Sequence, residues 1–356
     1  MPRPATHPAR HRRAPALALT VAAGLLAACG GGAPRGVALG LPLPSLRPFP
    51  APAPASAPAT PKPSVGPPGR LSGLPTKPGS GVLAVKVDGT AGGRPQAGLG
   101  SADVVYVEQV EGGLTRFLAV LNSRLPARIG PVRSVRTDNV DLLAQYGKVA
   151  FAYSGGQPAA LSVVRGSTLV DAGFDTLTGL YHPDGGRPAP YNLFVDPAEA
   201  LKAAPGDGAH DVGMRFDVSK DPKTGAGVEV ALGYPSAQYV FTYDRPSRQY
   251  GVTQDGVVLT DDGGGPLRVA NVVVQRVVQV ATGLKDVNGN YTPANITTGT
   301  GVVTVFRDGH AVEGTWSRPA STNPTRWRTP RGADVSLRPG STWVLLATAG
   351  APLSAK

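Results

Sequence analysis

The sequence predicts an α+β fold, with a mixed α/β N-terminal domain over residues 71–225 and a mostly antiparallel β C-terminal domain over residues 226–356. Short apolar runs rich in Val and Tyr recur between glycine turns, and such runs are typical of strands. In the first half they alternate with segments that have helix start and stop signals. In the second half strand patterns stand almost alone, which favours an antiparallel sandwich or barrel.

The first 28 residues have the features of a lipoprotein signal peptide. Four arginines precede the apolar run APALALTVAAGLLAA, which is too short and too closely followed by polar, proline-rich chain to be a membrane span. The run ends in LAAC, which resembles a bacterial lipobox, and its Cys29 is the only cysteine of 356 residues. Because a lone thiol cannot form an internal disulfide, we expect Cys29 to begin the mature chain and to carry acyl chains such as palmitate. An ordinary secretory signal with a stray cysteine is the alternative.

Residues 29–70 are expected to be the lipidated cysteine followed by a spacer. Residues 30–70 contain 12 of the 37 prolines, many of them alternating with alanine. Such chain favours extended, polyproline-like conformations and buries no core. At about 3.1 Å per residue it would reach on the order of 100 Å from the membrane. We therefore expect a folded body that is tethered to the extracytoplasmic face of the cell membrane.

The net charge of +11 does not indicate a nucleic-acid partner. Residues 1–70 contribute eight positive charges, and no acidic residue precedes Asp88. Subtracting these eight charges from +11 leaves +3 for residues 71–356. A nearly balanced body lacks the basic footprint of nucleic-acid recognition, whereas a basic leader and tether suit an anionic membrane or wall surface.

Two helices are expected in the first half. Thr137 is a candidate N-cap and Gly147 a stop signal for the first of them, and Ser154 is expected to cap the second. The expected elements are a strand over 81–88, a β-hairpin over 102–121 around the Gly112-Gly113 turn, a helix over 137–147, a strand over 148–154 and a helix over 157–166.

The second half is expected to form strands over 227–234, 237–244, 249–259, 268–280, 299–309, 310–318 and 341–347. The segment DVNGNYT, residues 286–292, resembles the start of a calcium loop. It lacks the glycine required at the sixth position, and Thr297 replaces the bidentate glutamate at the twelfth. The segment therefore predicts a hairpin turn.

Several unusual motifs follow one another along the chain: LSGLPT (71–76), RPQAGLGSADVVYVEQVEGGLTRFLAV (94–120), IGPVRSVR (129–136), SGGQPAAL (154–161), RPAPYNLF (187–194), NVVVQ (271–275), NPTRW (323–327) and PGSTWV (339–344). Their order resembles the YerB-like bacterial lipoproteins, the DUF3048 family, across nearly all of the chain after the tether. The resemblance implies an envelope-facing lipoprotein with two domains and links to cell-wall synthesis proteins. The chain departs from the family pattern at Tyr191, where relatives often have histidine, and in GGQPAA, where relatives tend to have a serine before the proline.

An arginine cluster is the main candidate for a binding site. Arg128, Arg133 and Arg136 precede the helix expected at 137, at a helix end where the macrodipole disfavours cations. Arginine forks bind carboxylates and phosphates, and glycine turns present backbone N–H groups to anions. We expect an anion site formed by Arg116, Arg133, Arg136, the turn Ser154, Gly155 and Gly156, and the loop residues Arg187 and Asn192.

Internal ion pairing is the alternative for each arginine. Acidic residues lie close to the cluster in sequence and could neutralise it inside the fold: Asp88, Asp103, Glu108, Glu111, Asp138 and Asp141. The sequence does not decide between an external anion and these carboxylates.

Catalysis has weaker support. Glu108, Asp138 and His182 are the candidates for acid–base chemistry, but no nucleophile motif accompanies them. The histidines of the mature chain, His182, His210 and His310, are too scattered for a metal site, and no cofactor motif is present. The favoured hypothesis is a lipid-anchored binding or scaffolding module that recognises an anionic cell-wall component or a cell-wall synthesis protein. An envelope hydrolase or transferase acting on an anionic wall substrate is the alternative.

Overall fold

The structure is a computed structural model and describes residues 67–356 apart from 78, 220–224 and 287. The described residues form one compact unit. The predicted signal peptide, the lipidation site at Cys29 and the tether up to residue 66 lie outside the described residues. No helix in the described part of the chain is long and apolar enough to cross a membrane.

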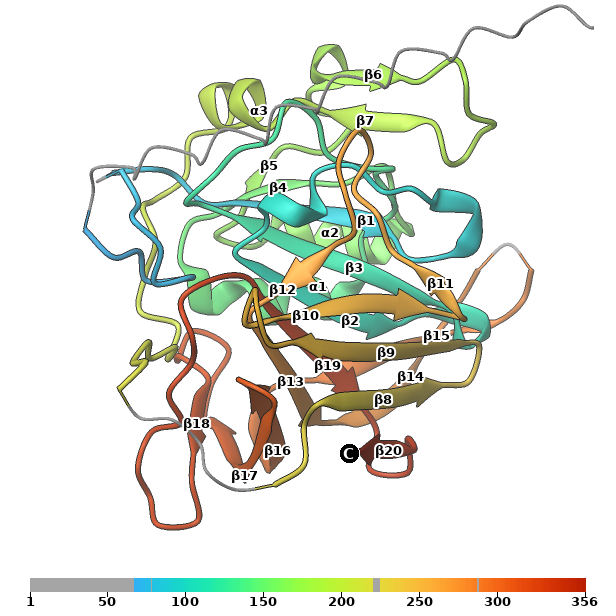
Figure 1. The fold of residues 1–356 in the computed structure, drawn as a ribbon. Coiled ribbons are helices and arrows are strands. Elements are labelled where there is room, and N and C mark those ends of the chain that lie inside the picture. The colour runs from blue at the N-terminus through green and yellow to red at the C-terminus, as the bar shows by residue number, and fades with distance from the viewer. Residues whose placement is uncertain (1–66, 78, 220–224, 287) are drawn as a thin grey trace, which may run out of the picture. The chain divides into compact units, whose positions relative to one another are not determined.

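A ten-stranded sheet runs through both halves of the described chain, in the order β18-β17-β16-β13-β19-β2-β3-β1-β4-β5. In Figure 1 the red strand β19 lies beside the blue-green β2, which shows how distant parts of the sequence share this sheet. Its strands are β1 (Leu83–Asp88), β2 (Val104–Gln109), β3 (Thr115–Leu121), β4 (Ala150–Ala152), β5 (Val170–Asp171), β13 (Asn271–Arg276), β16 (Gly299–Arg307), β17 (His310–Arg318), β18 (Arg326–Arg328) and β19 (Thr342–Ala347).

A second, antiparallel sheet has the order β11-β10-β9-β8-β20, with β12 paired to β10. Its longer strands alternate between buried and more exposed residues, as expected when one face packs on a core. These strands are β8 (Glu229–Tyr234), β9 (Ala237–Asp244), β10 (Gln249–Gln254), β11 (Val257–Val258), β12 (Arg268–Val269) and β20 (Leu353–Ala355). Two separate two-stranded ribbons are β6 (Tyr181–Pro183) with β7 (Leu193–Val195), and β14 (Val278–Lys285) with β15 (Tyr291–Ile296).

Both faces of the large sheet are covered, which explains why β1 and β19 are buried along their whole length. Helices α1 (Thr137–Leu143) and α2 (Pro158–Arg165) pack on one face. Helix α3 (Pro197–Ala203) and the second sheet pack on the other. Five short 3-10 turns complete the described elements: η1 (Ala91–Gly93), η2 (Leu99–Ser101), η3 (Glu111–Gly113), η4 (Ala144–Tyr146) and η5 (Thr178–Leu180).

The α+β class is confirmed, and so are the hairpin of β2 and β3 and the hairpin turn after Asp286. Gly112 adopts a φ of 64° in the turn of the first hairpin, a conformation that favours glycine. Gly147, at φ 81°, ends the first helical segment as predicted. Strands β5, β6, β7, β15, β18 and β20 were not among the expected elements.

Two predicted helix caps are wrong. Thr137 is the first helical residue of α1, and Arg136 occupies the capping position, where its backbone N–H donates to the side chain of Asn139 at 3.0 Å. Ser154 does not cap α2, because its hydroxyl donates to the carbonyl of Val132 at 2.9 Å. Gln157 is the residue that precedes α2.

The predicted domain boundary near residue 225 separates the sequence but not the large sheet. Strands β1 to β5 come from the first half, and β13 and β16 to β19 come from the second. The central contact between the halves is the parallel pairing of β2 with β19, from Val104 opposite Thr342 to Val107 opposite Leu345. The division into domains at residues 71–225 and 226–356 remains a prediction.

Candidate functional site

Charged side chains meet where the parallel strands β1, β2 and β4 end. Strands β1 and β2 both pair antiparallel with β3, and β4 pairs parallel with β1, so β1, β2 and β4 run in the same direction. Asp88 at the end of β1 lies in register with Arg116 of β3, which lies in register with Glu108 of β2. These three side chains therefore leave the same face of the sheet. In open α/β sheets, ligands bind beyond the carboxyl ends of such strands.

Lys86 and Glu108 form a fully buried ion pair on this face. The side-chain amide of Asn139 in α1 donates to the two carboxylate oxygens of Glu108 at 3.0 and 3.1 Å. Burial lowers the pKa of Lys86 and raises the pKa of Glu108, against the attraction of the partner charge in each case. The two charges compensate each other, and at 0% and 1% exposure neither has surface for a ligand.

Asp138 is also bonded internally. Its Oδ2 accepts from the backbone N–H and the side-chain amide of Asn295 in β15, at 2.8 and 3.0 Å. This contact ties the first turn of α1 to the β14–β15 hairpin. The acid–base roles expected for Glu108 and Asp138 remain predictions, and the described hydrogen bonds of both carboxylates go to internal donors.

Two of the predicted arginines are neutralised by carboxylates. Arg133 donates from Nη1 to Oδ2 of Asp88 at 2.6 Å. Arg136 donates two hydrogen bonds to Glu111, from Nε to Oε1 at 2.7 Å and from Nη2 to Oε2 at 2.5 Å. Arg136 lies at the N-terminus of the short helix α1, and Glu111 neutralises its charge. No external anion is therefore needed to balance the cation at this helix end. For these two arginines the structure shows the internal pairing that the sequence left open.

The environment of Glu111 favours its charged form. Burial raises the pKa of Glu111, but the hydrogen bonds and charge of Arg136, with a 2.6 Å bond from the hydroxyl of Thr292, outweigh burial and lower the pKa to about 2. Thr292 belongs to β15, so this bond joins the hairpin of the second half to the arginines of the first.

Arg116 forms no ion pair with any described residue. Asp88 and Glu108, its neighbours in register, bond to Arg133 and Lys86 instead. The described hydrogen bond of Arg116 runs from Nη1 to the carbonyl of Ser134 at 3.2 Å. Burial lowers the pKa of this half-buried guanidinium, and repulsion from Arg136 and Arg133 lowers it further. We refer to Arg116, Arg133 and Arg136 as the arginine cluster from here on, because Arg128, which the sequence grouped with them, pairs with Asp184 and Asp262 instead.

The glycine turn is hydrogen-bonded to the loop that carries Arg133 and Arg136. Val135 donates its N–H to the carbonyl of Gly155 at 3.1 Å, and Ser154 donates its N–H to the carbonyl of Arg133 at 2.9 Å. A Cβ on Gly156 would lie 2.7 Å from Cγ1 of Val135, so the close approach requires glycine. The turn thus holds the loop that carries Arg133 and Arg136, and the N–H of Ser154 is already used in doing so.

The other predicted binding residues lie on the connection between β6 and β7. Arg187 donates to the carbonyls of Gly93 and Pro95 at 3.4 and 2.8 Å. Asn192 is half-buried and accepts from the N–H of Asp184 through its backbone carbonyl at 2.6 Å. Tyr191 of the same connection reaches the cluster, since the guanidinium carbon of Arg133 lies 5.4 Å from the centre of its ring.

The histidines stay apart from the arginine cluster. His182 is exposed on β6, and no described hydrogen bond or ion pair joins it to the cluster. No group of three or more metal-ligating side chains occurs among the described residues. In the expected hairpin turn, Asp286 accepts from the N–H groups of Asn288 and Asn290 at 2.9 and 2.8 Å.

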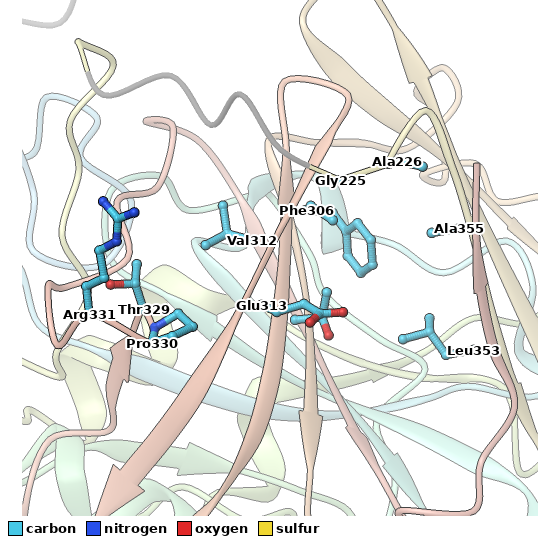
Figure 2. A pocket seen from close by; sticks show the side chains of 12 residues that line it. Gly225, Ala226, Phe306, Val312, Glu313, Thr329, Pro330, Arg331, Leu353 and Ala355 are labelled. Carbon is cyan, nitrogen blue, oxygen red and sulfur yellow. The ribbon is translucent and has the colours of Figure 1, made fainter.

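A cavity of about 870 Å³ lies away from these charged groups, between β16, β17 and β20. Figure 2 shows Glu313 in its middle beside Phe306 and Leu353, with Arg331 on the far side of Val312. Its lining is mainly apolar and it ends at Gly225, next to residues that the structure does not describe. Because its two charged residues lie apart and the titratable groups gather elsewhere, we place the candidate site at the arginine cluster.

Sequence reasoning missed Lys86. A signal was present, because Lys86 interrupts the apolar run LAVKVD of a strand that is buried on both faces. Charged residues are almost never fully buried unless they are paired. Glu108 breaks the run VVYVEQ of β2 in the same way, and the two interruptions together indicate a buried pair.

The sequence of the folded body matches two models of one family. The N-terminal domain model of the protein family of unknown function DUF3048 matches residues 71–210, and its C-terminal domain model matches residues 229–344. The chain belongs to the DUF3048 family.

Relatives of this DUF3048 chain agree in sequence and in fold. It is 27% identical over 273 residues to the putative lipoprotein YerB of Bacillus subtilis, covering 74% of this chain and 80% of that protein. It also resembles the crystal structure of the YerB protein from Bacillus subtilis, with a TM-score of 0.68 and 23% identity, covering 80% of this chain and 98% of the other. The structural likeness confirms that the DUF3048 fold is shared.

Proposed function

We propose that the protein is a lipid-anchored binding protein on the extracytoplasmic face of the cell membrane, and that its arginine cluster binds the anionic group of a cell-wall component. Homology to a putative lipoprotein supports the anchor, as does the lipobox-like LAAC at Leu26–Cys29. The observation that carries the binding function is Arg116, which has no carboxylate partner among the described residues although two carboxylates flank it in register.

The charge balance supports an anionic ligand. The cluster holds the guanidiniums of Arg116, Arg133 and Arg136 against the carboxylates of Asp88 and Glu111, which leaves one positive charge. Lys86 and Glu108 compensate each other, and the carboxylate of Asp138, which acts on that buried pair, accepts hydrogen bonds from Asn295 and lies outside this count. A phosphate or carboxylate would gain charge-assisted hydrogen bonds from Arg116 and relieve the repulsion among the three guanidiniums.

The test is phosphate binding by the full-length protein in detergent micelles, measured by isothermal titration calorimetry. We expect the wild type to bind inorganic phosphate and Arg116→Met to lose most of that affinity. Arg128→Met is the matched control, because Arg128 is an exposed arginine already paired with Asp184 and Asp262 outside the cluster. Equal phosphate affinity in the wild type and both variants would refute the proposal, and so would no binding by the wild type.

The anchor has its own test. Cys29→Ala removes the thiol that a thioether lipid requires, so we expect the variant to leave the membrane fraction of cells and to appear with the soluble extracytoplasmic proteins. Membrane fractionation that is unchanged in Cys29→Ala would contradict lipid anchoring at this residue. The result is independent of phosphate binding, so the lipid anchor and the anion site are tested separately.

A further inference from the structure

A second cavity adjoins the arginine cluster at the same edge of the large sheet. It has a volume of about 310 Å³, is lined by residues 89–92, Thr115, Tyr191, Ser236 and Gln254-Asp255, and is called the Gln254 pocket below. Thr115 and Arg116 are successive residues of β3, and successive side chains of a strand leave opposite faces. The pocket therefore lies on the side of the second sheet, and the arginine cluster lies on the side of α1.

Gln254 lines this pocket, and its side chain has an unsatisfied acceptor. The residue is 1% exposed, and its Nε2 donates to the carbonyl of Gly89 at 2.6 Å. Its Oε1 is buried and has no hydrogen-bond partner in the described part of the chain. Buried polar atoms are nearly always hydrogen-bonded, because leaving one unpaired costs about 1–3 kcal/mol. A donor that enters the pocket would remove this cost.

The other polar groups of the pocket also leave acceptors for a ligand. Ser236 uses its hydroxyl proton on the carbonyl of Gly112 at 2.8 Å, so the lone pairs of its oxygen are free to accept. Asp255 accepts from Arg94 at 2.7 Å and from the N–H of Gln238 at 2.8 Å. Because Arg94 already pairs with its charge, this carboxylate can accept further hydrogen bonds but does not require a cation. The complementary ligand group is an uncharged donor such as a hydroxyl.

Tyr191 connects the pocket with the arginine cluster. Its ring lines the pocket, and the guanidinium of Arg133 lies over that ring. On the other side, Thr90 lines the pocket and donates its hydroxyl to Asp88 at 2.6 Å, and Asp88 is the ion-pair partner of Arg133. Arg133 thus contacts one wall of the pocket directly, through Tyr191, and is linked to a second wall, at Thr90, through Asp88.

We propose that the Gln254 pocket binds hydroxyl groups of the ligand whose anionic group binds the arginine cluster. The ligand class is then a hydroxylated anion, such as a phosphorylated sugar or polyol. This inference rests on the proposed function, because the arginine cluster supplies the anchoring charge. It adds that the uncharged part of the ligand carries hydroxyl groups.

The test compares two phosphate monoesters that have six carbons each and differ in their hydroxyl groups, glucose 6-phosphate and hexyl phosphate, on the full-length protein in micelles. We expect glucose 6-phosphate to bind about 5- to 10-fold more tightly, the factor that one net hydrogen bond supplies. Gln254→Met should remove this preference and leave the affinity for inorganic phosphate unchanged, since methionine keeps the length of the side chain but cannot satisfy a hydroxyl donor.

Gln96→Met is the matched control. Gln96 is another fully buried glutamine with an unpartnered Oε1, and its Nε2 donates to the carbonyl of Asp88 at 3.1 Å, but it does not line the pocket. We expect this variant to keep the preference for glucose 6-phosphate. If Gln254→Met fails to fold, the comparison of the two esters on the wild type still tests whether the hydroxyl groups of the ligand contribute to its affinity.

Each outcome has a distinct meaning. Equal affinity of the wild type for the two esters, or a preference that survives Gln254→Met, would overturn the role of the pocket and leave the anion site intact. A preference lost equally in Gln96→Met would also overturn it, because the effect would then be general. Failure of phosphate and of both esters to bind would refute the proposed function together with this inference.

Discussion

Arg116 and Asp88 are direct cross-strand neighbours on one face of the large sheet, yet they form no ion pair. Asp88 bonds instead to Arg133, which lies on the loop over residues 130–136. On the other side of Arg116, Glu108 is bonded to Lys86. Both carboxylates beside Arg116 are therefore occupied by other cations, and the guanidinium keeps its charge without a described counterion.

Replacing Arg116 should cost little stability, whereas replacing Arg136 should cost much. Arg116→Met removes one bond to a carbonyl and relieves repulsion, so we expect a change within about 1 kcal/mol in the free energy of unfolding. Arg136→Met leaves Glu111 unpaired at 5% exposure, which should cost about 3–5 kcal/mol. Urea unfolding measures both. An equal loss in the two variants would mean that Arg116 has a structural role.

The buried pair of Lys86 and Glu108 should show strong coupling in a double-mutant cycle. Lys86→Met leaves an uncompensated buried carboxylate and should lower the free energy of unfolding by about 3–5 kcal/mol. Adding Glu108→Gln removes that charge and keeps an acceptor for Asn139, so the double variant should recover most of the loss. Additive losses in denaturant unfolding would argue against the pair.

Glu111 should make the free energy of unfolding depend on pH in the acidic range. Its pKa falls from an ordinary 4.5 to about 2 in the folded protein. A depressed carboxylate pKa adds stability that is complete above about pH 4.5 and is lost as the pH falls toward 2, a contribution of about 3 kcal/mol. The difference in unfolding free energy between wild type and Glu111→Gln, measured from pH 7 to pH 3, should shrink below pH 4.5. A constant difference would contradict the assignment.

The first half of the body should not fold alone. Residues 71–225 without β19 would expose the edge of β2 and lose the contact of Trp343 with Phe117, whose ring centres lie 5.2 Å apart. We expect residues 67–356 to unfold cooperatively on heating when circular dichroism is followed, and we expect this fragment to lack such a transition. A monomeric fragment with a sharp transition would contradict this expectation and would show that the N-terminal domain predicted from the sequence folds on its own.

Much of the fold was predictable because the signals are local. The run VVYVEQ, the turn at Gly112-Gly113 and the run TRFLAV predict a hairpin without reference to any other part of the chain. The short elements β18 and β20 carry no such signal, since each has three residues and depends on pairing with a longer strand. The predicted cap at Ser154 failed because its hydroxyl bonds to the carbonyl of Val132 instead. The predicted cap at Thr137 failed because the helix begins at that residue, one position earlier than the pattern indicates.

The sequence proposed some members of the candidate site but not their pairing. By itself it singled out Arg116, Arg133, Arg136 and the turn at Gly155 as residues that would form an anion site if their loops met at one edge of the sheet. Only the tertiary structure decided which arginine lacks a carboxylate. That choice depends on the register that places Arg116 between Asp88 and Glu108, and on Lys86 and the 130–136 loop reaching those two carboxylates first. Ion pairing is a short-range contact between residues far apart in the chain, so no local pattern specifies it.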